Sequence, residues 1–508
     1  MTSLSRRHFL ALTSFLPAAA APLPPGEQAL ARKLVDLYST RQRGSRWSRN
    51  GATVEIAGRA VPRRLTYRDD TLFPSACARL LESGEGSEAR LGAWLLESAS
   101  IANRPAAVRV ALKHLGASDG VVRFHLLKSL LELGDVASLL RATRDSSEAH
   151  EVGLRSLAGG NNLSAATGRR PFTPGACFWF EGYDDDFGAA QFRKLARFGV
   201  REVSLHTFDP MQQGKHNPVL REGRRSFGIP NLGAWVAAAK RASIDVTLKP
   251  HLEMGFRRLT DAERRILGEG SDPEKQGLRA VIERERAEAG WHGDIEMKSE
   301  ADWKRWFEGY SAYLLSHAAS AAAAGVSAFC VGREIDRTVI AREAAWRHLI
   351  KQVRDVFKGP LTYSAHHDSF DRLPFWDALD VIGVSAYPQV DTTLPPRMDT
   401  VRAGWATFVS RCATLSRKVG RPLGWTEVGY PAVDTAAAEP WREDTSEANV
   451  ILQSRLLGAA LEAARQSDAI RGACVWLWEG VSEPPFRDRS FTIQDKPAAF
   501  ALASIYRR

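Results

Sequence analysis

Residues 327–365 read SAFCVGREIDRTVIAREAAWRHLIKQVRDVFKGPLTYSA. A short apolar run at Ser327–Gly332 is followed by an amphipathic segment at Ala341–Phe357 and by a second apolar run at Leu361–Ala365. A strand, a helix and another strand in this order are typical of a βα unit in a parallel sheet.

The same alternation continues on both sides of this stretch. It gives eight candidate strands: Ala176–Phe180, Glu202–Thr207, Asp245–Pro250, Ser327–Gly332, Leu361–Ala365, Val381–Ala386, Leu423–Glu427 and Ala473–Trp478. Eight βα units over residues 175–508 predict an α/β fold, the (β/α)8 TIM barrel. A doubly wound open sheet is the alternative, and it should begin with a glycine-rich turn after the first strand. Glu181–Asp186 has a single glycine and four acidic residues there, which favours the barrel.

Residues 22–160 show a helical pattern instead. From about Thr71 to Leu163, apolar residues recur at i, i+3 and i+4 between breaks of Gly, Ser, Asp and Asn. We predict a small all-α domain, built either as HEAT-like repeats or as a plain bundle. Its acidic residues, His and Cys do not cluster in a catalytic arrangement, so packing or contact with a protein partner is its expected role. Residues 161–174, which contain Gly and Pro, are the predicted linker.

The N-terminus has the pattern of an export signal. Arg6 and Arg7 precede a short apolar stretch, Phe9–Leu16, and a small-residue cleavage site at Ala18–Ala21. This arrangement resembles a twin-arginine signal peptide over residues 1–21. After this segment, no stretch of the sequence has the roughly 20 consecutive apolar residues that a membrane-spanning helix needs. We therefore expect the mature chain to be exported, to the periplasm or beyond the cell, without an integral membrane segment.

The composition narrows the classes of function. The sequence has 69 Lys and Arg against 59 Asp and Glu, a formal charge of +10. The two signs are interspersed along the chain, which is unlike a nucleic-acid-binding surface. The five cysteines are widely separated and include no C-x-x-C pair, so they predict neither a disulfide framework nor a zinc or redox motif. No nucleic-acid partner is expected.

Two glutamates stand at the ends of predicted barrel strands, where the catalytic groups of this fold lie. Glu334 ends the fourth strand and Glu427 the seventh, each after an apolar run with a glycine nearby. The two strands lie roughly across the barrel from one another, so both side chains can reach one central volume. Glycoside hydrolysis needs such a pair, because one carboxyl protonates the leaving oxygen while the other attacks the anomeric carbon.

A series of motifs makes this reading more specific. In chain order they are Thr247–His251, Trp291–Gly293, the aromatics Trp303, Trp306, Phe307 and Tyr310, Phe329–Glu334, Trp346 with Arg347 and Ile350, Phe375 with Trp376, Asp380–Gly383, and Thr426–Tyr430. With them, residues 175–479 resemble the clan of retaining (β/α)8 glycoside hydrolases and look most like glycoside hydrolase family 113, the β-mannanase family. The resemblance implies that Glu334 is the acid/base, that Glu427 is the nucleophile and that Tyr387 hydrogen-bonds the nucleophile.

One position departs from the clan. Most of its members have Asn just before the acid/base glutamate, where it binds the sugar 2-hydroxyl, and this chain has Arg333. A guanidinium close to Glu334 favours the ionised carboxylate, whereas a general acid must hold its proton. Neighbouring strand residues point to opposite sides, so an Arg333 that faces away from the cavity is equally consistent with the sequence.

Other side chains near the strand ends are candidate substrate-binding groups, because the apolar face of a pyranose packs on aromatic rings and imidazole nitrogens bind hydroxyls. They are Trp179, His206, His251, Trp291, His366, Tyr387, Trp425, Trp476 and Trp478. We expect about half of the tryptophans to be core residues instead, since large aromatics are mostly buried. Between Trp476 and Trp478 the second, nearer the strand end, is the favoured platform.

His366, His367 and Asp368 are residue types that bind metal ions. Adjacent strand residues point apart, however, and so we predict no metal site. No motif signals a cofactor.

Together these features predict an exported retaining endo-β-glycosidase. It would hydrolyse a polysaccharide, β-1,4-mannan or glucomannan by the resemblance, through a double displacement by two glutamates. The alternative is a non-catalytic carbohydrate-binding or scaffold protein on a degenerate barrel, which Arg333 keeps open. Exo action or transglycosylation by the same residues is a third reading.

Overall fold

The computed structural model describes most of the chain after the predicted signal peptide. The described residues are 26–39, 53–56, 59–62, 70–159, 172–178, 185–221, 232–255, 266, 271–442, 447–479 and 484–508. The predicted signal peptide at 1–21 and most of the predicted linker at 161–174 lie outside them. The chain divides into two compact units, residues 1–145 with 481–487 and residues 146–480 with 488–508.

The first unit is mainly helical, in partial agreement with the predicted all-α domain. Its described helices are α2 (Glu27–Ser39), α4 (Phe73–Leu81), α5 (Gly86–Leu96), α6 (Arg104–His114), α7 (Gly120–Leu133) and α8 (Val136–Thr143). Local sequence sets the ends of α7: the Asp119 side chain accepts hydrogen bonds from two backbone N–H groups of the first turn, and Gly134 ends the helix at φ +86°. A two-stranded antiparallel sheet, β1 (Thr53–Ile56) with β2 (Arg59–Pro62), was not part of the prediction.

Eight parallel strands form a closed barrel in the second unit. They are β3 (Thr173–Phe178), β4 (Glu202–Gln213), β6 (Asp245–Gly255), β7 (Ala328–Arg333), β8 (Leu361–His366), β9 (Val381–Ala386), β10 (Leu423–Val428) and β11 (Ile470–Trp478). Each pairs with the next in this order, and β11 pairs back to β3. The closure excludes the doubly wound open sheet. A short strand, β5 (Leu220–Arg221), adds to the extended end of β4 in antiparallel orientation.

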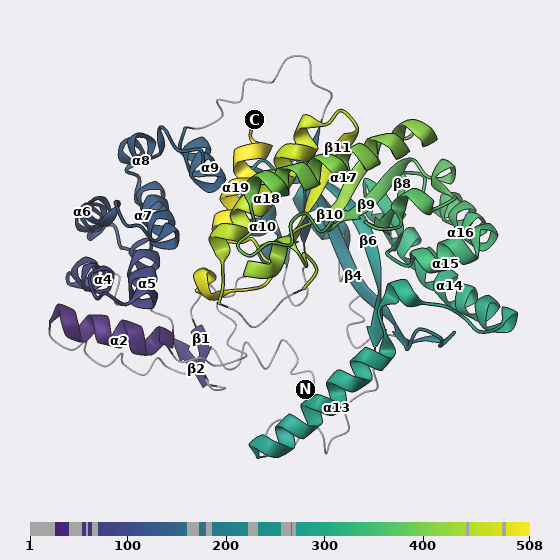
Figure 1. Cartoon of the computed structure of the whole chain (residues 1–508), viewed down its shortest axis with the longest axis horizontal. Coiled ribbons are helices and arrows are strands. Elements are labelled where there is room, and N and C mark those ends of the chain that lie inside the picture. The colour runs from purple at the N-terminus through teal and green to yellow at the C-terminus, as the bar shows by residue number, and fades with distance from the viewer. Residues whose placement is uncertain are drawn as a thin grey trace. The chain divides into compact units, whose positions relative to one another are not determined.

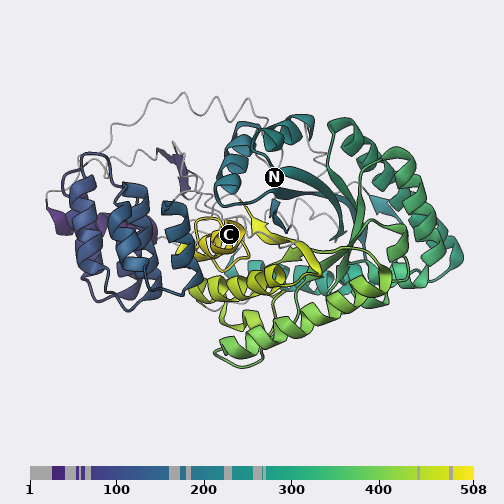
Figure 2. The ribbon, with the colours of Figure 1, turned by 90° about the horizontal axis from the view of Figure 1, so that it is seen from above.

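Helices cover the outside of the strands, as Figure 1 shows and as Figure 2 shows from above. They are α10 (Asp185–Arg197), α11 (Leu232–Arg241), α14 (Glu300–Ala324), α15 (Asp336–Ala341), α16 (Glu343–Val356), α17 (Met398–Val419), α18 (Val450–Gln466) and α19 (Pro497–Tyr506). Helix α13 (Asp272–Ala289) is not part of this layer and extends away from the strands in Figure 1. The pattern in α16 explains why it packs there. Trp346, Leu349, Ile350 and Val353 are its buried residues, and their spacing places them on one face of the helix.

The eight predicted strands are all present, with small differences at their ends. Val381–Ala386 agrees with β9, whereas β3 begins at Thr173 rather than Ala176, inside the stretch assigned to the linker. Strands β4 and β6 extend past their predicted ends at Thr207 and Pro250. These extensions pair with each other as far as Gln213 and Gly255.

Helix α9 (Ala149–Ala158) lies in the barrel unit, whereas the predicted division placed residues up to 160 in the helical domain. It packs on α19, and the two backbones approach most closely at Gly153. A β-carbon at that position would lie 1.7 Å from the carbonyl oxygen of Phe500. The pattern of apolar residues in one amphipathic helix shows which face is buried, but it does not show against which of the two units that face packs.

Among the described residues, no helix combines the length and the apolar character that crossing a membrane requires.

Candidate active site

A cavity of about 580 Å³ opens among the residues at and beyond the carboxyl ends of the barrel strands. Both predicted catalytic glutamates line it, together with four of the predicted substrate-binding residues. The lining residues are Trp291, His292, Arg333, Glu334, His366, His367, Asp368, Tyr387, Glu427, Trp441, Trp476 and Phe491. The two carboxyl groups therefore face one shared volume, as glycoside hydrolysis requires.

Glu427, on β10, is held at both carboxylate oxygens. Lys249 Nζ, from β6, lies 2.7 Å from Oε1, and the Tyr387 hydroxyl donates to Oε2 over 3.1 Å. Burial alone would lower the pKa of Lys249, but the facing carboxylate outweighs it and raises the pKa above its ordinary value. Burial also raises the pKa of Tyr387, so its hydroxyl keeps the proton that it donates. These contacts hold the Glu427 carboxylate in one position, from which it can act as a nucleophile.

Glu334 follows β7 in an unusual backbone conformation. Its φ is +52°, in the left-handed region that non-glycine residues seldom adopt, and its N–H donates to the carbonyl oxygen of Ser364. Strained backbone of this kind is concentrated at functional sites. The pairing between β7 and β8 is irregular between Cys330 and Arg333, immediately before it. The irregularity brings Arg333 and Glu334 to the same cavity, where simple alternation along a strand would separate them.

Two groups contact one oxygen of Glu334. Arg333 Nη1 and His292 Nε2 each lie 3.2 Å from Oε2. Burial raises the pKa of Glu334, but the charge of Arg333 and the hydrogen bond from His292 outweigh it and hold the pKa well below its usual range. Burial, helped by the charge of Arg333, lowers the pKa of His292 to about 4. His292 is then neutral near pH 7, and Glu334 is ionised before substrate binds.

Trp476, rather than the favoured Trp478, lines the cavity. Beneath it lie His206 and His251, both buried, with ring centroids 5.0 and 6.1 Å from that of Trp476. His251 Nε2 is also 3.8 Å from Glu427 Oε1. Neither imidazole is among the residues that line the cavity. The two histidines therefore pack against Trp476, and His251 also lies beside the nucleophile Glu427.

Two predicted platforms belong to the barrel wall. Trp425 is buried against Trp405 and Phe408 of α17. A register irregularity in β10 between Trp425 and Glu427 explains this, because residues two apart on a regular strand would share a side. Trp478 is also buried, and its indole N–H donates to the Gln191 side chain of α10. Trp179 lies outside the described residues.

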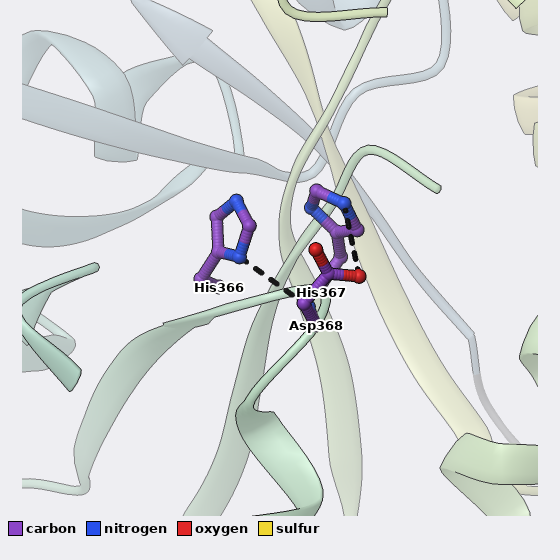
Figure 3. A group of neighbouring side chains, drawn as sticks. All are labelled: His366, His367 and Asp368. Carbon is purple, nitrogen blue, oxygen red and sulfur yellow. Dashed lines mark hydrogen bonds and ion pairs between the residues drawn. The ribbon is translucent and has the colours of Figure 1, made fainter. Parts of the chain in front are cut away.

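The candidate metal ligands at the cavity rim are closer together than strand alternation predicts. One ligand atom from each of His366, His367 and Asp368 lies within 4.8 Å of the other two, as Figure 3 shows. Only His366 belongs to β8, and the chain turns directly after it, with the Asp368 N–H 3.4 Å from His366 Nδ1. The three side chains therefore do not point apart as adjacent residues of one strand would.

Lys249, His292 and Trp441 are site residues to which the sequence reasoning gave no role. The sequence could have indicated a role for Lys249, because a lysine inside an otherwise apolar strand needs a buried partner of opposite charge. His292 stood in a quoted motif without an assignment. Trp441 lies in a loop beyond β10, where no periodic pattern marks it.

Comparisons with known proteins agree with the barrel fold. Residues 279–496 match the family model described as Glycoside Hydrolase Family 113. The chain contains a GH113-like TIM barrel. The GH113 β-mannanase AaManA from Alicyclobacillus acidocaldarius, solved in complex with ManMIm, has 24% sequence identity and a TM-score of 0.52 over 66% of this chain and 97% of that chain. No curated protein matches the sequence.

A second solved structure, of a GH113 β-1,4-mannanase, has 21% identity and a TM-score of 0.53. It covers 66% of this chain and 99% of that chain. At these identities the likeness establishes the fold of the GH113-like barrel, the closed eight-stranded arrangement on which the site stands.

Proposed function

We propose that the barrel is a retaining endo-β-glycosidase that acts on β-1,4-mannan or glucomannan. The observation that carries the proposal is the unlike setting of two carboxylates in one cavity. Lys249 and Tyr387 contact the two carboxylate oxygens of Glu427, whereas Arg333 and His292 both contact a single oxygen of Glu334. Mannan enters as the substrate because the similar solved structures are those of β-mannanases.

The proposed reaction has two displacements. In the first, a carboxylate oxygen of Glu427 attacks the anomeric carbon, the glycosidic bond breaks, and Glu334 gives its proton to the departing oxygen. In the second, Glu334 takes a proton from water, the water oxygen attacks the anomeric carbon, and the bond to Glu427 breaks. Two inversions at one carbon give net retention.

Glu334 must be protonated before the first displacement. Its two contacts favour the ionised form, so the active fraction is small near neutral pH and grows as the pH falls. The proposal therefore includes an acidic optimum for hydrolysis.

The test uses the full exported chain with Glu427→Ala and Glu334→Gln. Each variant should lose most hydrolysis of β-mannan, measured as new reducing ends, while its circular dichroism and melting temperature stay near those of the wild type. Near-wild-type rates in either variant would remove the assignment. Tyr506→Phe serves as the matched control for substitution of a buried polar group, because Tyr506 does not line the cavity and the change removes only a hydroxyl that donates to barrel backbone.

Azide distinguishes retention from inversion in the same variants. In Glu334→Ala, azide should attack the glycosyl-enzyme from the face that water uses and give the β-glycosyl azide. In Glu427→Ala, azide should enter from the face that the missing carboxylate vacates and give the α-glycosyl azide. Loss of activity without either product would contradict the double displacement.

Arg333 supports a second candidate, a non-catalytic carbohydrate-binding protein, because it holds the only proposed general acid in its ionised form. A panel of mannan, glucomannan and xylan separates the two functions. A pure binder is retarded by a polysaccharide gel without producing reducing ends.

We also propose export through the twin-arginine motif at Arg6 and Arg7. A reporter fused to residues 1–21 should leave the cytoplasm, and its Arg6→Lys, Arg7→Lys variant should not. Reporter activity that stays in the cytoplasm with the natural motif would contradict this.

A further inference from the structure

The turn that follows β8 brings three side chains of metal-binding type together. One ring nitrogen each of His366 and His367 and one carboxylate oxygen of Asp368 lie within 4.8 Å of one another. Figure 3 shows the three side chains gathered at the turn, and the two imidazole rings have centroids 4.0 Å apart. Within the described ranges, no other group of three His, Cys, Asp or Glu side chains is as close.

The kinds of ligand atom indicate which ion would bind. Two imidazoles and one carboxylate suit zinc and similar divalent transition-metal ions, whereas calcium and magnesium prefer oxygen ligands. A tetrahedral zinc ion needs its ligand atoms roughly 3.4 Å apart. The Asp368 side chain is 71% exposed and can rotate to close the difference. Three protein ligands then leave the fourth position to water.

The charges in the cavity also favour a cation at this turn. Three carboxylates line the cavity, those of Glu334, Asp368 and Glu427. Arg333 lies 3.2 Å from the carboxylate of Glu334, and Lys249 lies 2.7 Å from that of Glu427. Asp368 has neither Lys nor Arg within ion-pair distance in the part of the chain that the structure describes. A bound cation would supply the positive charge that this carboxylate lacks.

His367 has a ring nitrogen that the folded chain leaves unused. The residue is 5% exposed, and its Nδ1 has no hydrogen-bond partner among the described residues. A buried polar atom without a partner costs free energy, which a bond from its lone pair to an ion would recover. Imidazole nitrogens are also the commonest metal ligands in proteins.

Asp336 holds the turn in the shape that gathers these ligands. Its Oδ2 accepts hydrogen bonds from the His366 N–H, over 2.9 Å, and from the Ser369 hydroxyl, so it binds both ends of the turn. Its Oδ1 accepts a hydrogen bond from the Tyr363 hydroxyl over 2.7 Å. Buried groups behind the ligands position them in the same way in known metal sites.

Two indoles restrict the imidazoles further. The Trp291 ring meets His366 edge-on at a centroid distance of 4.9 Å, and the Trp441 ring lies within 17° of parallel to His367 at 5.8 Å. Since the turn and both rings are held by these contacts, little conformational freedom would be lost when an ion binds.

We propose that His366, His367 and Asp368 bind a divalent ion of the zinc class, which competes with the polysaccharide for the cavity. All three residues line the same cavity as Glu334 and Glu427, so an ion and its bound water would occupy space that the substrate needs. The competition rests on the proposed function, whereas binding of the ion does not.

Calorimetric titration of the untagged full chain with ZnCl2, after EDTA treatment and dialysis, tests the site directly. We expect one zinc ion per chain, and CaCl2 or MgCl2 in about tenfold excess should not displace it. Asp368→Ala should weaken zinc binding at least roughly tenfold, because loss even of a group behind the ligands costs roughly 10–100-fold in affinity. The variant should fold normally, since the side chain is exposed.

Asp399→Ala is the matched control, because Asp399 is also exposed and does not line the cavity. It should bind zinc as the wild type does. Weak binding of several ions that Asp368→Ala leaves unchanged would be adventitious surface binding and would overturn the site. Displacement of zinc by CaCl2 would overturn the assignment of imidazole ligands.

Hydrolysis of β-1,4-mannan gives the second readout. Zinc at a concentration that fills the site should raise KM of the wild type severalfold with little change in kcat, and EDTA should reverse the effect. In Asp368→Ala the same zinc concentration should leave KM near the zinc-free value of that variant. Equal inhibition of both proteins, or bound zinc that leaves the wild-type KM unchanged, would overturn the competition. A wild type that releases no reducing ends contradicts the proposed function instead, while the titration still decides the zinc site.

Discussion

Lys249 Nζ lies 2.7 Å from Oε1 of Glu427, and both side chains are almost completely shielded from solvent. The same ammonium group donates to the Thr426 carbonyl oxygen over 3.1 Å. One cation from β6 thus fixes both the backbone of β10 and the carboxylate that it carries. This buried ion pair therefore fixes the position of the nucleophile.

Lys249→Met should disable the nucleophile. Removing one partner of a buried ion pair leaves the other uncompensated, at a cost of roughly 3–5 kcal/mol. We expect the Glu427 carboxylate to lose its fixed position and its partner in the variant, so that kcat/KM falls by at least roughly a hundredfold. Lys249→Arg keeps the charge and should retain more activity. Equal rates in Lys249→Met and the wild type would contradict the role.

Tyr387→Phe should make Glu427 a poorer nucleophile without removing a charged side chain, because it removes one hydrogen bond that positions the carboxylate. The lost hydrogen bond to Glu427 Oε2 is one to a charged group, worth roughly 1.5–3 kcal/mol. A decrease in kcat of roughly tenfold to a hundredfold is expected, with little change in KM, because the ring itself remains in place. Single-turnover kinetics should show the loss in formation of the glycosyl-enzyme, and a loss confined to KM would contradict this.

Arg333→Asn should move the pH dependence of hydrolysis. Arg333 is a cause of the low pKa of Glu334, so its removal raises that pKa. The general acid works only while protonated, and the proton is lost as the pH rises through its pKa. The alkaline limb of kcat/KM should therefore move to higher pH in the variant.

The stability of this variant provides an independent check with a defined sign. Because the folded-state pKa of Glu334 is depressed, the pair contributes stability that is present above the unfolded pKa and is lost as the pH falls. Arg333→Asn should therefore be less sensitive to acid than the wild type, as measured by melting temperature against pH. An unchanged alkaline limb would show that Arg333 does not set the protonation of Glu334.

The barrel and the positions of its two glutamates could be predicted from the sequence, because the same local pattern, an apolar strand followed by an amphipathic helix, repeats eight times. Eight apolar runs separated by helices define the closed sheet, and in this fold the functional groups lie at strand ends. Glu334, Glu427, Tyr387 and His366 could all be placed in this way. Each of them lines the cavity or faces it from a strand end.

The side of the strand on which each tryptophan lies could not be predicted in this way. Alternation along a strand predicts that Trp425 shares a side with Glu427 and that Trp476 shares one with Trp478. Register irregularities in β10 and β11 break both relations. Such irregularities depend on neighbouring strands that are distant in sequence. The position of Trp441 in the cavity lining could not be predicted either, because Trp441 lies in a loop whose path depends on contacts that are distant in sequence.

Gly293→Ala should test whether the position of Trp291 matters. A β-carbon at Gly293 would lie 2.0 Å from Cζ3 of the Trp291 ring, far inside van der Waals contact, so the indole must move. Because this indole is partly exposed, the movement should alter the melting temperature little. If Trp291 packs on the substrate, kcat/KM for β-1,4-mannan should fall severalfold. Gly424→Ala provides the matched control, since the nearest atom to a β-carbon there is 3.7 Å away. A Gly293→Ala variant that cleaves mannan as fast as this control would show that the indole can leave its observed position without consequence for catalysis.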